Sequence, residues 1–493
     1  MSKIIVIGSG FSGLSAAAYL AAADNEVHVF EKNGSAGGRA SQIKTPEGYV
    51  FDMGPSWYWM PEIFEQFFND FGFKAADFYR LDLLDPGFEV VFPNKELIKI
   101  PADFEELCTL FESIENGASK KLIKFMDEAK YKYETGMGNL SAMPGNSISE
   151  FLQPDLVKGV LRLQIFSSFK KHVAEYFKDP RLISIMEFPV IFLGAMADKM
   201  PALYSLMNYA GLKLGTWYPE GGFGSVVAGM VQVGKLNSVR YHFNSPVNKI
   251  VVKNNQVVGI EVNDKFFQAD AVIASADYHF VEKELLAEEF RNYSEEYWDN
   301  KTLAPSSLIF YLGVSKKIEK LLHHTLFFDE DLDQHTREIY DTPQWPTKPL
   351  FYVCCPSKSD NTVAPAGHEN IFILMPLAVG IEDNEELRDK YFKILMKRLE
   401  LHAGESISEF IDYKKSYCIN DFISDYNSYK GNAYGLANIL RQTAILKPKM
   451  KNKKLKNLFY TGQLTVPGPG VPPSIISGKM AAQQLSTFFK KHL

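Results

Sequence analysis

Cysteine is scarce in this sequence, with four residues in a chain of 493. Four cysteines are too few for a disulfide framework at this length, and none stands in Cys-x-x-Cys spacing. Cys354 and Cys355 fall in an apolar run, which predicts a packed strand and not a redox pair. We therefore expect a reducing, cytoplasmic environment.

An excess of basic charge and a long apolar run are also missing. The 53 basic and 59 acidic side chains give a net charge of -6, which argues against a nucleic-acid partner because phosphate neutralisation needs a basic surface. No stretch reaches the roughly 18 consecutive apolar residues that span a bilayer, and the nearest, Phe188 to Ala197, stops at Asp198. Hydrophobic residues are abundant at 46%, with 13% aromatic. The composition predicts a large core, and the length predicts about three domains.

The N-terminal residues have the pattern of a dinucleotide-binding unit. Ile4 to Ile7 predicts a buried parallel strand, a helix follows, and a second strand ends on Glu31. A G-x-G-x-x-G turn joins the first strand to the helix and consists of Gly8, Ser9, Gly10, Phe11, Ser12 and Gly13. Such glycines allow a tight turn, a close pyrophosphate and close helix packing, while the acid binds a ribose diol. The pattern therefore predicts a bound dinucleotide.

Further glycine-rich segments extend this site. Gly37-Gly38-Arg39 comes shortly after Glu31-Lys32 and resembles the second glycine pair of the glutathione-reductase-like FAD enzymes, which implies backbone near phosphate and a cation beside the pyrophosphate. Near the other end, a strand from Leu458 to Thr461 ends at Gly462, and Gly470-Val471 precedes an amphipathic helix. The positive end of that helix suits a ligand on which negative charge collects.

These motifs resemble those of the glutathione-reductase-like FAD enzymes. The segments GTWYPEGG (215–222), GNAYGLANILRQ (431–442) and PGPGVP (467–472) closely resemble the bacterial phytoene desaturase family, the CrtI-type carotenoid desaturases. The resemblance runs from residue 4 to about residue 485. It implies FAD as the cofactor, and it implies that the residues binding it are Gly8, Gly10, Phe11, Ser12, Gly13, Glu31, Lys32, Gly38, Arg39, Pro55, Ser56, Trp57, Val247, Gly462, Gln463, Gly470 and Val471.

For three of these positions the resemblance implies a particular surrounding. Trp57 belongs to a turn that the resemblance places close to the isoalloxazine, and the Val247 backbone is placed near the adenine. Gln463 departs from related flavoproteins, which often carry Ala, Asp or Glu there. A carboxylate contact to the pyrophosphate or ribityl chain is therefore not available at that position.

The predicted fold is α/β, with a discontinuous glutathione-reductase-like Rossmann domain for FAD and an inserted α+β substrate domain with a helical lid or membrane-associating region. We assign residues 1–80, 216–290 and 430–493 to the FAD domain, 81–215 to a helical part of the substrate region, and 291–429 to a mixed sheet and helix domain. Three segments, 247–252, 257–262 and 271–275, are expected to form an antiparallel meander. The apolar stretch Ile183 to Tyr209 predicts either a buried helix pair or a lid over an apolar cavity.

Candidate residues outside the glycine motifs are few. Glu187 is the best candidate for an acid or base, because a carboxylate in an apolar run has a raised pKa, although a structural role has more in its favour. We assign no metal site, and we interpret the histidines and acids between His323 and His335 as a solvated loop. Six lysines between Lys447 and Lys456 are either solvated or attract an anionic membrane face.

The leading hypothesis is an FAD-dependent desaturase that acts on phytoene or a related carotene by hydride transfer to flavin N5. Gly222-Phe223-Gly224 lacks the spacing of a second dinucleotide site, so electrons are expected to pass to oxygen or a quinone. A hydrophobic carotenoid and a peripheral membrane contact are the expected partners. The alternatives are a desaturase of hydroxylated or partly cyclised carotenoids, a redox-neutral carotenoid isomerase, and a non-catalytic isoprenoid escort protein.

Overall fold

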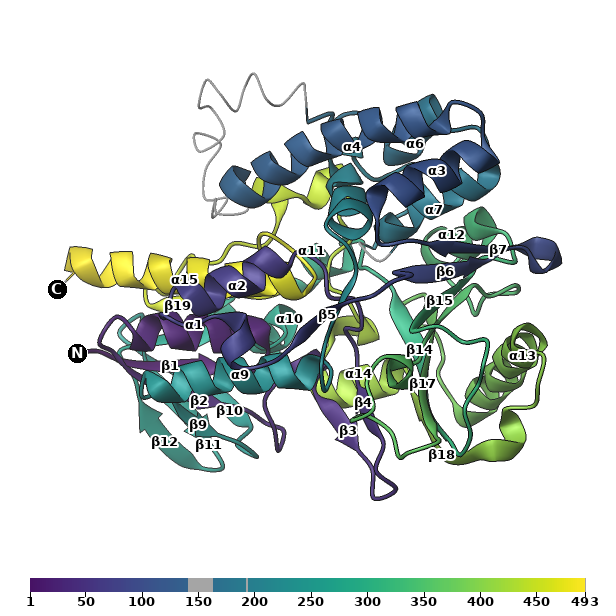
Figure 1. The fold of residues 1–493 in the computed structure, drawn as a ribbon. Coiled ribbons are helices and arrows are strands. Elements are labelled where there is room, and N and C mark those ends of the chain that lie inside the picture. The colour runs from purple at the N-terminus through teal and green to yellow at the C-terminus, as the bar shows by residue number, and fades with distance from the viewer. Residues whose placement is uncertain (141–162, 192–193, 493) are drawn as a thin grey trace.

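A parallel five-stranded sheet forms the centre of the nucleotide-binding part of the molecule (Figure 1). The computed structural model describes residues 1–140, 163–191 and 194–492. The strand order is β19-β13-β1-β2-β9, and the strands are β1 (Lys3–Ile7), β2 (Glu26–Phe30), β9 (Arg240–His242), β13 (Ala271–Ala274) and β19 (Leu458–Tyr460). Strands from the two ends of the chain therefore share one sheet, which confirms the predicted discontinuous α/β domain.

Helix α1 (Phe11–Ala21) lies between this sheet and the C-terminal helix α15 (Val471–His492), and glycine makes both contacts possible. A Cβ at Gly13 would lie 2.1 Å from the carbonyl oxygen of Gly8, and a Cβ at Gly478 would lie 2.3 Å from that of Ser12. Ser15 adds a hydrogen bond of 2.7 Å from its Oγ to the carbonyl oxygen of Ile475. The two helices therefore pack backbone to backbone.

The predicted meander is present, but its third strand is not the expected one. Strands β10 (Val247–Lys253), β11 (Gln256–Val262) and β12 (Lys265–Gln268) pair antiparallel in that order. Residues 271–274 instead form β13 in the parallel sheet, where β13 pairs with both β1 and β19. The prediction was wrong because all four residues of β13 are buried and apolar, which suits a central parallel strand.

A mixed seven-stranded sheet forms the second half of the molecule, at the right of Figure 1. Its order is β18-β14-β17-β16-β15-β6-β7, with β6 (Phe88–Val91), β7 (Leu97–Ile100), β14 (Ser306–Val314), β15 (His324–Phe327), β16 (Phe351–Cys354), β17 (Glu369–Leu377) and β18 (Ile411–Tyr417). Helix α13 (Glu385–Ala403) covers one face, where Leu395 and Leu399 pack with Leu308 and Phe310. Strands β6 and β7 come from the segment predicted to be helical, so that segment contributes to the sheet as well.

Smaller elements connect the two sheets. The short strands pair as β3 (Gln42–Lys44) with β4 (Val50–Asp52) and β5 (Leu81–Leu83) with β8 (Trp217–Pro219). The remaining helices of these regions are α2 (Pro61–Asn69), α9 (Phe223–Leu236), α10 (Tyr278–Glu284), α11 (Glu295–Asp299), α12 (Leu332–Tyr340) and α14 (Ile419–Tyr426).

A helical layer lies at the top of Figure 1, beside one end of the seven-stranded sheet. It contains α3 (Phe104–Ile114), α4 (Ala118–Thr135), α6 (Phe169–Tyr176), α7 (Pro180–Ile191) and α8 (Leu206–Asn208). The apolar stretch 183–209 runs through α7 and α8, apart from residues 192–193, which lie outside the described part. In the described residues, no helix combines the length and apolarity that crossing a bilayer requires. Whether this layer acts as a lid remains a prediction.

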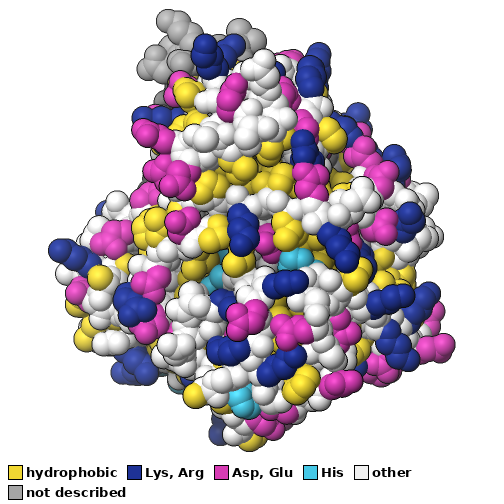
Figure 2. All heavy atoms as spheres, turned by 45° about the vertical axis from the view of Figure 1, so that its right-hand side comes forward, with side chains coloured by type: hydrophobic (Ala, Val, Ile, Leu, Met, Phe, Trp, Pro, Cys, Tyr) yellow, Lys and Arg dark blue, Asp and Glu magenta, His cyan; other side chains and the backbone are white. Residues whose placement is uncertain are grey.

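The largest hydrophobic core fills the space between the helical layer and the second face of the seven-stranded sheet. Phe188 of α7, Phe88 of β6 and Tyr352 of β16 belong to it, and Trp57 packs against it. Figure 2 shows hydrophobic side chains gathered in a band below the helical layer. This aromatic core adjoins the glycine turns that follow β1 and β2.

Candidate functional site

The two N-terminal glycine motifs lie against each other at the carboxyl ends of β1 and β2. Gly10 and Gly37 form a parallel bridge, and the Gly37 amide donates to the Ser9 carbonyl oxygen at 2.9 Å. A Cβ at Gly38 would lie 3.3 Å from the Cα of Gly10. Apart from Gly10 itself and its two chain neighbours, no atom of the described residues lies within 4 Å of the position that a Cβ of Gly10 would occupy. Open space therefore begins at Gly10, beside the N-terminus of α1.

Glu31 fixes the shape of this turn. Its carboxylate accepts hydrogen bonds from the Ser9 amide at 2.9 Å, the Ser9 Oγ at 2.8 Å and the Asn33 amide at 3.0 Å. A carboxylate has about four acceptor positions, so one remains for a ligand hydroxyl. The predicted ribose contact is compatible with this arrangement, but Glu31 also has a structural role that the sequence did not indicate.

Arg39 is half-buried and faces a set of polar groups from distant segments. Its Nη2 donates to the Ser428 Oγ at 3.0 Å and to the Asn432 carbonyl oxygen at 3.3 Å, and its guanidinium lies 5.2 Å from the Tyr426 ring centre. Its Nε is buried and has no partner among the described residues. Burial lowers the pKa of Arg39, and the nearby Asp277 carboxylate opposes this effect. The guanidinium is therefore a cation with an unused donor.

Asp277 was missed by the sequence reasoning. It follows β13, so it lies at the same sheet edge as the glycine turns. Burial raises its pKa, while Arg39 and the amides of Phe280 and Tyr429 lower it. An acidic residue three positions after a buried strand is the signal that would have identified it.

The C-terminal segments complete the site. A Cβ at Gly462 would lie 3.1 Å from the Ser12 Oγ. Gln463 donates from Nε2 to the Asn432 Oδ1 at 3.3 Å, so its amide links this turn to the residues around Arg39. Gly470 has a φ of 112° and immediately precedes α15, whose Val471 packs with Phe11. The N-terminal part of α1 thus packs against the first eight residues of α15.

The turn from Asp52 to Trp57 connects this site to the aromatic core. A Cβ at Gly54 would lie 2.6 Å from the carbonyl oxygen of Arg39, so the turn packs directly on the arginine. The Trp57 ring stacks on His324 with 4.1 Å between ring centres and lies 5.3 Å from Phe188. The Tyr352 hydroxyl donates to the Ser56 Oγ at 3.0 Å. Residues 55–57 therefore lie between the glycine turns and a packed cluster of Phe88, Phe188, His324 and Tyr352, which forms the aromatic chamber.

The arrangement fits a dinucleotide with a flat aromatic end. Gly10 leaves space beside the uncapped N-terminus of α1, Arg39 offers an unused donor, and the chamber at Trp57 is apolar. These are the features that a pyrophosphate and an isoalloxazine ring require.

Three predicted residues lie at the margins of this arrangement or outside it. Lys32 donates from Nζ to the Ser424 carbonyl oxygen at 2.5 Å. Val247 begins β10 and packs with the hydrophobic cluster of Ile7 and Phe30. Glu187 is 4% exposed on α7, and its electrostatic neighbours are Lys170, Asp333 and Asp198. Its Oε1 has no partner among the described residues, and burial raises its pKa to about 7.

Two interpretations of charged segments need correction. His323, His324 and His335 are buried and not in a solvated loop, because β15, the residue before it and α12 lie in the core. Lys447 is also buried, and its Nζ donates to the Asn438 Oδ1 at 3.1 Å. Burial lowers the pKa of Lys447 to about 8. The lysine run is therefore not one uniform solvated face.

Comparison with known proteins identifies the class. Residues 11–486 match the family described as flavin containing amine oxidoreductase. A carotenoid 3,4-desaturase from Haloarcula japonica is 38% identical over 98% of this chain and 97% of its own length. A zeta-carotene-forming phytoene desaturase from Myxococcus xanthus is 27% identical over 99% and 94%. Among solved structures, a redesigned putrescine oxidase superposes with a TM-score of 0.65 at 13% identity and covers 99% of both chains.

The fold, the glycine turns and the family match define an FAD-dependent flavoprotein, and the chain belongs to the flavin-containing amine oxidoreductase family. Within that family it is a member of the CrtI-type carotenoid desaturases.

Gly10→Ala and Gly13→Ala should separate ligand binding from folding. A methyl group at Gly13 meets the Gly8 carbonyl, so we expect the apoprotein to lose about 1–3 kcal/mol or more. A methyl group at Gly10 meets no other side chain or backbone among the residues that the structure describes, so stability should change by less than about 0.5 kcal/mol while bound flavin falls sharply. Urea unfolding of the apoproteins and flavin absorbance per chain measure the two effects. Equal flavin retention in Gly10→Ala and wild type would contradict the assignment.

Glu187→Gln should stabilise the protein increasingly as pH rises from about 4.5 to about 7, and to the full extent above that. The folded-state pKa of Glu187 is raised above its ordinary value, so the unfolded chain loses this proton first and stability falls as pH rises from about 4.5 to about 7. The neutral amide removes that loss, which amounts to up to about 3 kcal/mol at pH 8. Urea unfolding at pH 5 and pH 8 tests this. A difference of the same size at both pH values would mean that the carboxylate is ionised in the folded protein.

Proposed function

We propose that this protein is an FAD-dependent desaturase that introduces conjugated double bonds into phytoene or a related carotene. The observation that carries the proposal is the aromatic chamber joined to the glycine turns through Ser56 and Trp57. The relatives named carotenoid 3,4-desaturase and phytoene desaturase support the same reaction class.

An apolar pocket extends this chamber. It is lined mainly by side chains of β15, α12, β16 and β17, including Leu326, Phe328, Ile339, Leu350 and Leu374. Tyr352 also lines the pocket, and its hydroxyl contacts Ser56 in the predicted flavin turn. A polyene without polar groups can be held only by such surface, because its binding depends on apolar area removed from water. We place part of the substrate chain here.

The chemistry divides between cofactor and protein. Bound FAD supplies a hydride acceptor at N5. Each new double bond requires loss of a hydride from an allylic carbon and of a proton from its neighbour, so the protein would hold that carbon beside the cofactor and exclude water from the positive charge that develops. The rings of Trp57 and Tyr352 lie 5.4 Å apart, and aromatic rings in general can stabilise a nearby cation without a titratable group.

In the proposed complex, a separate group of residues contacts each part of FAD. The turn Gly8, Gly10, Phe11, Ser12 and Gly13, with Gly38 and Arg39, holds the pyrophosphate, and Glu31 and Lys32 lie toward the ribose. Val247 lies at the adenine. Residues Pro55, Ser56, Trp57, Gly462, Gln463, Gly470 and Val471 surround the ribityl chain and isoalloxazine. We also retain the division into an FAD domain (1–80, 216–290 and 430–493) and a substrate region (81–215 and 291–429).

We further propose oxygen or a quinone as the electron acceptor and a peripheral contact with a membrane. The segment from Leu440 to Lys456 supports the contact, because Leu440 is 39% exposed, Leu446 is 50% exposed, and Lys453, Lys454 and Lys456 are exposed nearby in the sequence. Exposed apolar and basic side chains together favour an anionic lipid surface. Such a location gives direct access to lipid-soluble carotenes.

Anaerobic incubation of the FAD-loaded protein with phytoene tests the reaction. We expect loss of oxidised flavin absorbance together with new polyene absorbance at longer wavelength, because each new double bond requires one hydride. Addition of oxygen or a soluble quinone should then restore the oxidised flavin. Cis to trans conversion without flavin reduction would contradict desaturation and indicate an isomerase. Tight carotene binding with neither change would indicate an escort protein.

Replacing Lys453, Lys454 and Lys456 with glutamine should weaken binding to anionic vesicles. Each lysine contributes up to about 1 kcal/mol near a charged surface, so we expect affinity to fall at least tenfold at low salt. Sedimentation with vesicles that contain phosphatidylserine measures this. The matched control replaces Lys390, Lys393 and Lys397, which are exposed on α13. Equal loss in both triple variants would show a general charge effect and no specific face.

A further inference from the structure

Two histidines and one cysteine lie close together in the protein interior, next to Trp57. His323, His324 and Cys354 are all buried, and one nitrogen or sulfur donor atom from each lies within 4.8 Å of the others. His324 and Cys354 are directly opposite each other in the antiparallel pair of β15 and β16. Their side chains therefore leave the same face of the sheet, and the His323 ring lies 4.4 Å from that of His324.

The hydrogen bonds of the two imidazoles leave one nitrogen of each ring unused. The His323 Nδ1 pairs with the Ser359 Oγ at 2.5 Å, and the His324 Nδ1 pairs with the Tyr352 hydroxyl at 2.7 Å. Both Nε2 atoms are buried and have no partner among the described residues. Buried polar atoms are normally satisfied, and a histidine that binds a metal through one nitrogen is usually fixed by a hydrogen bond at the other. The pattern is therefore that of two oriented ligands.

The charge around the triad also suits a cation. Asp360 acts electrostatically on His323, and Asp52 acts on Cys354. Asp360 is held by the Tyr218 hydroxyl at 3.1 Å, and the Tyr218 ring lies 4.6 Å from that of His323. A divalent ion bound by a thiolate and two neutral imidazoles has a net charge of +1, which these carboxylates offset.

We propose that His323 Nε2, His324 Nε2 and Cys354 Sγ bind a zinc ion. Nitrogen and thiolate ligands are those that zinc prefers, with bond lengths of about 2.0–2.1 Å to nitrogen and about 2.3 Å to sulfur. Tetrahedral bonds of that length bring the donor atoms to about 3.5 Å from one another, so the side chains move inward by about 1 Å on binding. Binding forms two Zn–N bonds and one Zn–S bond and releases the thiol proton to solvent, with no change of oxidation state.

The expected consequence is local rigidity below the predicted flavin turn. The ion joins β15 to β16 and fixes the ring on which Trp57 stacks at 4.1 Å. This proposal does not rest on the proposed desaturase activity, because metal content is measured without turnover.

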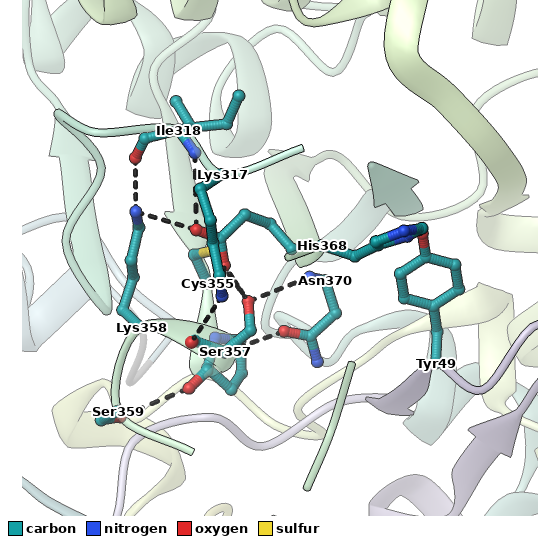
Figure 3. Close-up of polar contacts among 11 residues, drawn as sticks. Tyr49, Lys317, Ile318, Cys355, Ser357, Lys358, Ser359, His368 and Asn370 are labelled. Atoms are coloured by element: carbon teal, nitrogen blue, oxygen red, sulfur yellow. Dashed lines mark hydrogen bonds and ion pairs between the residues drawn. The ribbon is translucent and has the colours of Figure 1, made fainter. Parts of the chain in front are cut away.

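Cys355 provides a matched control beside Cys354. Figure 3 shows Cys355 next to Ser357, with Lys317 and Lys358 close by, in a separate polar cluster. Its Sγ donates to Glu369 at 3.6 Å, and it packs in the cluster of hydrophobic side chains under α13. Cys354→Ser and Cys355→Ser therefore make the same chemical change on opposite faces of the sheet.

The experiment measures metal in the full-length, FAD-loaded protein. Elemental analysis should find about one zinc per chain in wild type and Cys355→Ser, and at least a tenfold lower content in Cys354→Ser and in the double variant His323→Gln, His324→Gln. After removal of zinc with a chelator, Co²⁺ should produce a thiolate charge-transfer band in the near ultraviolet and d–d bands beyond the flavin absorption. Flavin content and circular dichroism establish that each variant is folded.

Three outcomes would overturn the zinc proposal. A substoichiometric metal content in the purified protein together with no cobalt spectrum would overturn the proposal. Copper or iron at one per chain would overturn the choice of zinc. Equal zinc in Cys354→Ser and Cys355→Ser would also overturn it. If Cys354→Ser does not fold, the cobalt charge-transfer band of the wild-type protein decides, because that band requires a thiolate ligand.

Discussion

The architecture depends on how closely α1 can approach β1 and α15. Gly13 and Gly478 have no side chain that would hold these elements apart. The backbone of α1 therefore contacts the turn at Gly8 through Gly13, and it contacts the backbone of α15 through Gly478. This contact places the N-termini of α1 and α15 at the same edge of the parallel sheet, next to Gly10 and Gly462. The two positive helix ends, Arg39 and the open space at Gly10 then form one electropositive region suited to a diphosphate. Every other part of the site is positioned relative to this contact.

The second half of the molecule supplies the apolar side of the site. Its seven-stranded sheet has α13 on one face, while the other face carries Tyr352 and Leu374 toward Trp57 and Phe188. The turn that carries Trp57 packs through Gly54 directly on Arg39, so the polar and apolar halves of the site share one short segment. A flat ligand spanning that segment has its charged end at the helix termini and its reactive ring at the aromatic side chains. Only part of the aromatic content lies in this chamber, because Phe64, Phe67 and Phe68 of α2 belong to a separate core.

Sequence reasoning succeeded where a local pattern determines local geometry. The spacing of Gly8, Gly10 and Gly13 after a β-branched run predicted the first turn and its role in helix packing. It failed where a residue's environment is created by distant strands. The short run of β13 was assigned to a meander because periodicity alone does not distinguish an edge strand from a central one. His323 and His324 were predicted to be solvated, and Lys447 to be either solvated or at a membrane face, because charge and polarity suggest exposure. Pairing of β15 with β16 and the loop before β19 bury them instead.

The discontinuous sheet also affects how the chain is made. Strand β1 ends at Ile7, and β13 pairs with it. Strand β19 pairs with the other edge of β13 and begins only at Leu458. Roughly 450 residues therefore leave the ribosome between them, which takes on the order of 20–90 s at typical rates of synthesis. During that interval the apolar face of α1 lacks the helix that covers it. Assembly of the nucleotide-binding half is consequently a late event, and the nascent chain must be protected from aggregation until α15 has been synthesised.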